Sequence, residues 1–180
     1  MKKYLKYMWS ILKHKYVVGL ECMRCGLFFR GVVHDISKFS PCEFSRYAAY
    51  FDEDKSRDDL EKIKEDYSVA WQHHKGHNPH HWEYWIDFDR DGNISAVKMP
   101  YDCVVEMVCD WIGAGKVYNK KSWNENEPME FYQERKDKIH LHPDTQKLFL
   151  LFLGIIRDFG LASFHQAARS AKTWVDYNKR

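Results

Sequence analysis

Residues 30–44 read RGVVHDISKFSPCEF, and this stretch sets a histidine and an aspartate side by side at the end of an apolar run. The apolar residues around the pair predict a buried helix face: Val32, Val33, Ile36 and Phe39. A carboxylate on such a face is costly unless a cation or a hydrogen-bond partner compensates it. A metal ion can do so, because it binds a neutral imidazole and a carboxylate together. The stretch therefore predicts a metal site at His34 and Asp35.

Two distant residues fit as further ligands of this metal. His14 lies near the end of a helix predicted from residue 3 to about 18. The alternative to a metal-ligand role is that His14 is a surface histidine in a lysine-rich turn. Asp110 interrupts the apolar face VVEMVCDWI of a helix predicted from Pro100 to about Tyr118. Two imidazoles and two carboxylates form a donor set suited to Mn, Fe, Co, Ni or Zn, and Mg also fits.

A second group of histidines is unusually dense, with five of them between residues 73 and 81: His73, His74, His77, His80 and His81. Such clustering indicates metal binding. The alternative is that some of them cap the end of the helix before the loop, where an imidazolium favours the helix dipole. We expect at least two of the five to line the site, and His140, His142 and His165 to be structural.

Helical periodicity dominates the chain and predicts an all-α fold. The expected helical segments are 3–18, a second one through Leu27, 41–51, 58–74, 100–118, 128–139, 144–158 and 161–176. The Asp-Gly pair at 91–92, between an aromatic run and ISAVKM, predicts a small β-hairpin inserted near 83–98, with strands at roughly 83–89 and 94–98. We expect one domain over 1–180, with a metal-site core at about 10–118 and the C-terminal helices of 128–176 packed on it.

Composition narrows the class of protein. A length of 180 residues can bury a sizeable core. The net charge of +2, with both signs interspersed, argues against a nucleic-acid partner. The five scattered cysteines predict buried free thiols. Lysines interrupt the apolar start, and no apolar run reaches the ~18–20 residues of a membrane span. We expect a cytoplasmic protein without a membrane partner, and a homo-oligomer is compatible with the sequence.

The order of these residues resembles the HD-domain phosphohydrolase superfamily, whose signature is a histidine, then a His-Asp pair, then a distant aspartate. The local match is closest to HDxGK of the cyclic-dinucleotide phosphodiesterase branch, with Ser37 where that branch has glycine. That branch also has a paired histidine before a Gly-rich loop, an Ile-Pro and an Ala-Asp helix, which compare with His73–His74, Met99–Pro100 and Cys109–Asp110. The resemblance covers about residues 10–115, and extends to an uncharacterised bacterial and phage family within the superfamily.

The resemblance implies an HD-domain-like helical bundle and a set of metal ligands. For a first metal they are His14, His34, Asp35 and Asp110. For a second metal they are His73 or His74, together with His80 or His81. The GYP tripeptide of the branch is absent, and NPHHWEYW replaces its glycine-rich loop. A cyclic-di-GMP substrate is therefore not implied.

The activity that this resemblance implies is hydrolysis of a nucleotide or another small phosphate ester, for which one or two metals activate water. Asp35 would belong to the catalytic set. Lys38 would place a cation beside the substrate phosphate, against the alternative of a solvated lysine, and Lys116 is a weaker candidate for the same role. Glu106, one turn before Asp110, would orient a ligand or accept a proton.

Trp82, with Tyr84 and Trp85, would line the pocket and stack on the base of a bound nucleotide. The alternative is that these aromatic residues lie in the core. Two other functions stay open. A few members of the superfamily are di-iron oxygenases, which the surplus of histidines fits. The helices could instead form a non-catalytic module in which a metal holds the fold together or the site senses a nucleotide.

Overall fold

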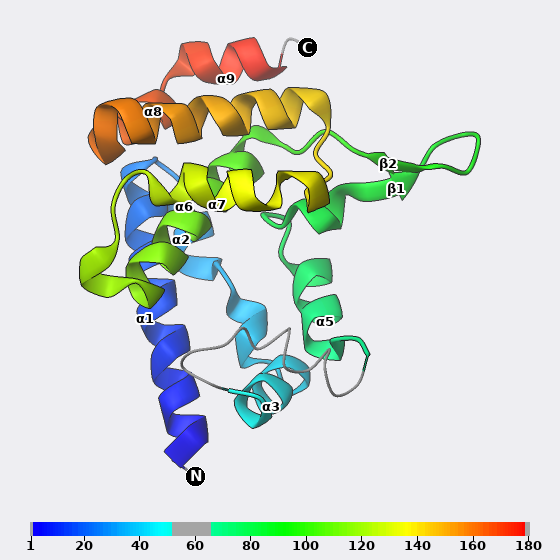
Figure 1. Cartoon of the computed structure of the whole chain (residues 1–180), viewed down its shortest axis with the longest axis vertical. Coiled ribbons are helices and arrows are strands. Elements are labelled where there is room, and N and C mark those ends of the chain that lie inside the picture. Colours follow the sequence, from blue (N-terminus) through cyan, green and yellow to red (C-terminus); the bar gives the residue numbers. More distant parts are fainter. Residues whose placement is uncertain (1, 52–65, 179–180) are drawn as a thin grey trace.

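The computed structural model describes residues 2–51 and 66–178, and the predicted all-α fold with a small β-hairpin is confirmed. Figure 1 shows α1 along one edge of the molecule, with α6, α7, α8 and α9 stacked across one end. The elements are α1 Lys2–Arg24, α2 Phe28–Val33, η1 Ile36–Phe39, α3 Pro41–Ala49, α5 Val69–His77, η2 Trp82–Trp85, β1 Ile86–Phe88, β2 Ile94–Ala96, α6 Tyr101–Tyr118, η3 Lys120–Ser122, α7 Glu127–Arg135, η4 Lys136–Lys138, α8 Pro143–Ala168 and α9 Ala171–Asn178.

Two apolar clusters hold the helices together. The larger joins α1, α6 and α8 and includes Val18, Val108 and Phe152, each fully buried. The smaller joins α1, α3 and α5 and includes Tyr7, Ile11, Tyr47, Ala48 and Ala70. On the buried face of α1, His14 lies between Ile11 of the smaller cluster and Val18 of the larger one. The polar site therefore forms where the two apolar clusters meet.

The stretch around His34 and Asp35 differs from the predicted buried helix. The α2 helix ends at Val33, His34 and Asp35 form a turn, and Asp35 is left-handed with φ 54°. Val32 is 48% exposed and Ile36 61% exposed, whereas the His-Asp pair itself is only 1% exposed. The prediction of an apolar buried face here was wrong, because α2 meets α1 through its backbone. A Cβ on Gly31 would lie 2.9 Å from the carbonyl oxygen of Gly19.

Capping residues fix where two of the shorter helices begin. The Ser40 hydroxyl accepts from the Glu43 amide, and Pro41 is the first residue of α3, as predicted. The Ser68 hydroxyl accepts from the Trp71 amide at 2.9 Å, so α5 begins at Val69. The prediction of one helix from residue 58 to 74 is therefore wrong at residues 66–68, which are not helical. Residues 58–65 lie outside the described part of the chain.

The hairpin is shorter than predicted. Strands β1 and β2 pair antiparallel, with Ile86 opposite Ala96 and Phe88 opposite Ile94. The 3₁₀ helix η2 covers Trp82–Trp85, so residues 83–85, which were expected in the first strand, are helical instead. The Trp85 indole donates to the Pro79 carbonyl at 2.7 Å and holds this turn against the preceding loop.

The long helix α8 supplies much of the larger cluster. It breaks at Gly160, where φ is 80°, as the predicted separation of helices 144–158 and 161–176 requires. The second predicted helix is itself divided, because α8 ends at Ala168 and α9 begins at Ala171. By length and composition α8 could cross a membrane, a test that core helices of soluble proteins also pass, whereas the sequence predicted no apolar run of that length. All five cysteines are free, four of them buried and Cys42 partly so, as predicted.

Candidate metal centre

Four side chains from three parts of the chain form the first group of donors: His14 of α1, His34 and Asp35 of the turn after α2, and Asp110 of α6. Nε2 of His14 lies 3.3 Å from Asp35 Oδ2 and 3.0 Å from Asp110 Oδ1. Nε2 of His34 lies 3.5 Å and 3.4 Å from the same two oxygens and 3.4 Å from Nε2 of His14. A tetrahedron with such edges has its corners about 2 Å from its centre, which is the usual Zn–N and Zn–O bond length.

The second group combines Asp35 with His74 of α5 and with His80 and His81 of the loop before η2. Asp35 Oδ1 lies 3.3 Å from Nε2 of His74 and 3.5 Å from Nε2 of His80. Nε2 of His81 lies 2.9 Å from Nε2 of His74. The two carboxylate oxygens of Asp35 thus face different groups, Oδ2 the first and Oδ1 the second. Asp35 is the residue that the two groups share.

The left-handed turn at Asp35 is what allows this sharing. On a continuous helix, neighbouring side chains point about 100° apart, whereas here the chain turns so that His34 and Asp35 both face inward. The Lys15 ammonium donates to the Val32 and His34 carbonyls, at 2.6 Å each. A cation at this position satisfies the last carbonyls of α2 and favours the helix dipole. Burial lowers the pKa of Lys15, while the nearby Asp35 and Glu106 carboxylates oppose that shift.

Glu106 connects the histidines of the two groups. Its Oε1 accepts from Nδ1 of His34 at 2.9 Å and from Nδ1 of His80 at 3.1 Å. Because each Nδ1 donates to this carboxylate, each Nε2 faces the donor groups and is the ring nitrogen that can bind a cation once it carries no proton. The other oxygen, Oε2, accepts from the Arg30 guanidinium at 2.8 Å, and Arg30 also pairs with Asp102. Burial alone would raise the pKa of Glu106, but the hydrogen bonds from the two imidazoles hold it well below its usual range.

Glu43 decides which of two neighbouring histidines faces the donors. Its Oε2 accepts from Nδ1 of His74 at 2.9 Å, which turns Nε2 of His74 inward. Its Oε1 accepts from Nδ1 of His73 at 2.7 Å, and the His73 ring stacks on His77 with centroids 4.0 Å apart. The structure therefore leaves His73, a predicted ligand, outside both groups. Sequence reasoning missed Glu43 and Arg30, because no local pattern in the sequence links them to these histidines.

The donor set fits divalent cations. Asp35 Oδ1 and His80 Nε2 are buried without a hydrogen-bond partner among the described residues. Burial alone would lower the pKa of His34, but the surrounding carboxylates, Asp35 foremost, raise it to about 10, so a cation bound here would displace a proton from this imidazole. Burial and the adjacent His80 and His74 lower the pKa of His81 well below its usual range, which keeps it neutral as a ligand must be. Buried carboxylates and imidazole lone pairs that converge in this way favour one or two borderline cations.

The remaining predicted residues lie in three different places. The Lys38 ammonium contacts Asp35 Oδ2, at the first donor group. Lys116 pairs with Glu21 at 3.0 Å and lies over the Trp123 ring, because six residues after Asp110 place it about 120° around α6. Trp82 packs against the larger apolar cluster and edge-on to the His140 ring. The structure does not bring Lys116 or Trp82 to the donors.

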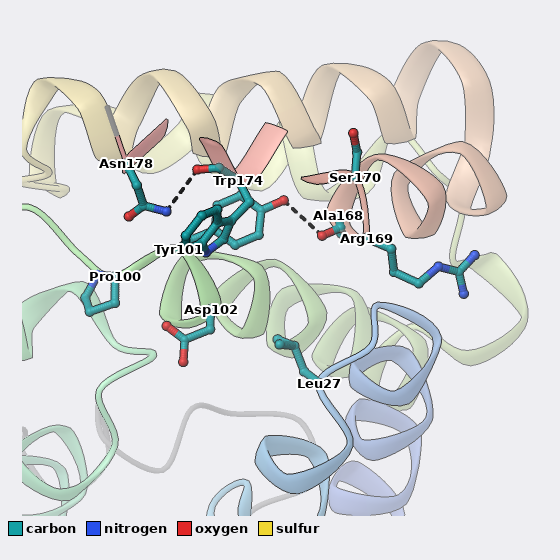
Figure 2. Close-up of a pocket in the computed structure, with 9 residues that line it drawn as sticks. All are labelled: Leu27, Pro100, Tyr101, Asp102, Ala168, Arg169, Ser170, Trp174 and Asn178. Carbon is teal, nitrogen blue, oxygen red and sulfur yellow. Dashed lines mark hydrogen bonds between the residues drawn. The ribbon is translucent and has the colours of Figure 1, made fainter. Parts of the chain in front are cut away.

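A hollow of about 430 Å³ lies apart from the donors, between the start of α6 and α9, and none of them lines it. Figure 2 shows Tyr101 and Trp174 on its wall, with the Tyr101 hydroxyl donating to the Ala168 carbonyl. Asp102 also lines it and, through Arg30, is connected to Glu106.

The fold and the site define an all-α protein with a small β-hairpin and two adjoining groups of histidine and carboxylate donors. The chain belongs to a family described as a family of unknown function, DUF5662, which matches residues 3–154. This span contains every donor of both groups. No match is found among curated proteins or among solved structures.

Proposed function

We propose that this protein is a metal-dependent phosphohydrolase that acts on a nucleotide or another small phosphate ester. The observation that carries the proposal is Asp35, whose two oxygens face two separate groups of donors. A carboxylate shared by the two donor groups would suit a site for two ions, and such a site would supply the chemistry for hydrolysis at phosphorus. The resemblance to the HD-domain superfamily supports the same activity.

One or two divalent cations, held by His14, His34, Asp35 and Asp110 and by His74, His80 and His81, would activate water and polarise a phosphoryl oxygen. Glu106 accepts from Nδ1 of two of these imidazoles, which would leave their Nε2 atoms to bind metal. Both its oxygens are engaged and its pKa is low, which favours its orienting role over that of proton acceptor. The Lys38 ammonium contacts Asp35 and would offset negative charge on a bound phosphate.

The test combines metal analysis with an activity screen. The purified protein is analysed for bound metal and assayed against phosphomonoesters, nucleotides and cyclic nucleotides with Mn, Co, Ni or Mg. We expect turnover with at least one metal and its loss in Asp35→Ala. Asp87→Ala, on the exposed hairpin, is the matched control and should retain activity. A panel that stays inert with every metal would overturn the proposal. Metal-dependent thermal stabilisation without turnover would indicate a binding module instead.

A di-iron oxygenase is the second candidate, favoured by the excess of histidine in the donor set. Five imidazoles, from His14, His34, His74, His80 and His81, accompany the carboxylates of Asp35 and Asp110. Iron close to two atoms per chain, with oxygen consumption on adding reductant, would support this candidate. A single non-iron metal would argue against it.

A further inference from the structure

The outward side of α1 is apolar, although its inward side already packs into both apolar clusters. Leu5, Trp9, Leu12 and Tyr16 follow at spacings of four, three and four residues, which places them on one helical stripe. Trp9 is 62% exposed and Tyr16 69% exposed. A soluble surface helix normally has a polar outer face, so this stripe calls for an explanation.

The neighbouring helix α2 enlarges the stripe. The close backbone contact between Gly19 and Gly31 sets α2 against α1, and Phe28 and Phe29 are 67% and 74% exposed there. We call the whole surface the outer apolar face: Leu5, Trp9, Leu12, Tyr16, Phe28, Phe29 and Val32. Apolar residues scattered singly over a surface are normal, whereas seven exposed apolar side chains on two neighbouring helices indicate an interaction surface.

Basic residues border this face. Lys2, Lys6 and Lys13 recur at spacings of four and seven, so they lie along one edge of the stripe beside Trp9. The first acidic residue in the sequence is Glu21, which is buried and paired with His165 at 2.7 Å. Whatever covers the face must therefore offer apolar contact and negative charge together.

An anionic lipid surface offers both, and a second copy of the chain would bring another set of lysines. We propose that the outer apolar face binds an anionic phospholipid bilayer peripherally, with α1 lying in the interface. Trp and Tyr are enriched at the interface between membrane and water. Amphipathic helices with Lys on the polar side commonly bind anionic membrane surfaces. The cytoplasmic leaflet is the anionic one, which agrees with the expected location.

The proposal leaves the candidate metal centre on the protein side of α1. His14 is buried on the face that packs into the molecule, opposite the stripe. The expectation of no membrane partner was based only on the lack of a predicted membrane-spanning segment, and a peripheral surface needs no such segment. A peripheral surface of this kind exists only once α1 and α2 are packed together.

Vesicle co-sedimentation of the full chain tests the proposal. The probes are vesicles of phosphatidylcholine alone and of phosphatidylcholine with phosphatidylserine in roughly a two-to-one ratio. We expect binding to the mixed vesicles, weakened by salt and about tenfold lower in a Trp9→Ala, Tyr16→Ala double variant. The matched control is Phe88→Ala, Ile94→Ala, which removes two equally exposed apolar residues from the hairpin and should bind like the wild type.

Three outcomes would overturn the proposal. The first is no binding to either vesicle by a folded wild-type protein. The second is an equal loss in the helix and hairpin variants. The third is a dimer, measured by light scattering, that Trp9→Ala and Tyr16→Ala convert to monomer, because then a second copy covers the face. These readouts do not depend on metal or turnover, so they stand apart from the phosphohydrolase proposal.

Discussion

Replacing Glu106 with glutamine tests whether this residue sets the tautomers of the two donor groups. In the wild type, Oε1 accepts from His34 and His80 while Oε2 accepts from Arg30. An amide satisfies only one side, since its N–H₂ must face either Arg30 or the two imidazole N–H groups. The loss of a partner that orients metal ligands typically costs about 10- to 100-fold in metal affinity, or about 1.4–2.7 kcal/mol. We expect Glu106→Gln to fall within this range.

The assay is competition between the apo-protein and a chromogenic chelator for Mn or Zn, with circular dichroism to establish that each variant is folded. Asp102→Asn is the matched control, because it removes the other carboxylate on Arg30 without touching an imidazole. Its partly exposed ion pair predicts a change of less than about threefold. Wild-type affinity in folded Glu106→Gln would refute the reasoning. An equal loss in Asp102→Asn would show that the effect arises at Arg30.

Three further predictions concern the scaffold around the site. Gly31→Ala should lower the free energy of unfolding by about 1–3 kcal/mol, because the new Cβ would lie 2.9 Å from the Gly19 carbonyl oxygen; an unchanged urea midpoint would contradict the close contact. Lys15→Met should weaken metal binding several-fold in the same chelator assay, because its ammonium holds the last carbonyls of α2 at 2.6 Å, and unaltered affinity would count against that role. Burial alone would raise the pKa of Glu21, but hydrogen bonds from His165 and a lysine lower it from 4.5 to about 2. The stability that Glu21 contributes is therefore full above about pH 4.5 and is lost as the pH falls toward 2, by up to about 3 kcal/mol. Urea unfolding measured across this pH range should show the loss. If Glu21→Gln had the same pH dependence as the wild type, Glu21 would not be its source.

Periodicity and burial arguments reached much of the fold from the sequence. The helix predicted from Pro100 to about Tyr118 is observed as Tyr101–Tyr118, because a long apolar pattern behind a proline is a strong local signal. The same reasoning marked Asp110 as a carboxylate on an apolar helix. The structure places it 3.0 Å from His14, which comes from a helix about a hundred residues earlier.

Exposure around the central stretch could not be predicted in the same way. A short apolar run in the sequence is compatible both with a buried position and with an exposed one. Here the backbone contact at Gly31 left Val32 and Ile36 exposed. The stripe on α1 can be read from residue spacing, whereas the part of the outer apolar face on α2 depends on that packing.

By itself the sequence determined which chemical groups are available: an adjacent His34 and Asp35, a dense run of histidines, and helices able to carry them. Tertiary structure decided which of these groups meet. Neighbouring residues on a helix point about 100° apart, so the packing of α5 against α3, where Glu43 accepts from both imidazoles, selects His74 over His73 as a donor. The left-handed turn at Asp35 then aims its two oxygens at different groups. Side-chain direction depends on contacts between distant segments, and those contacts form only when the chain folds.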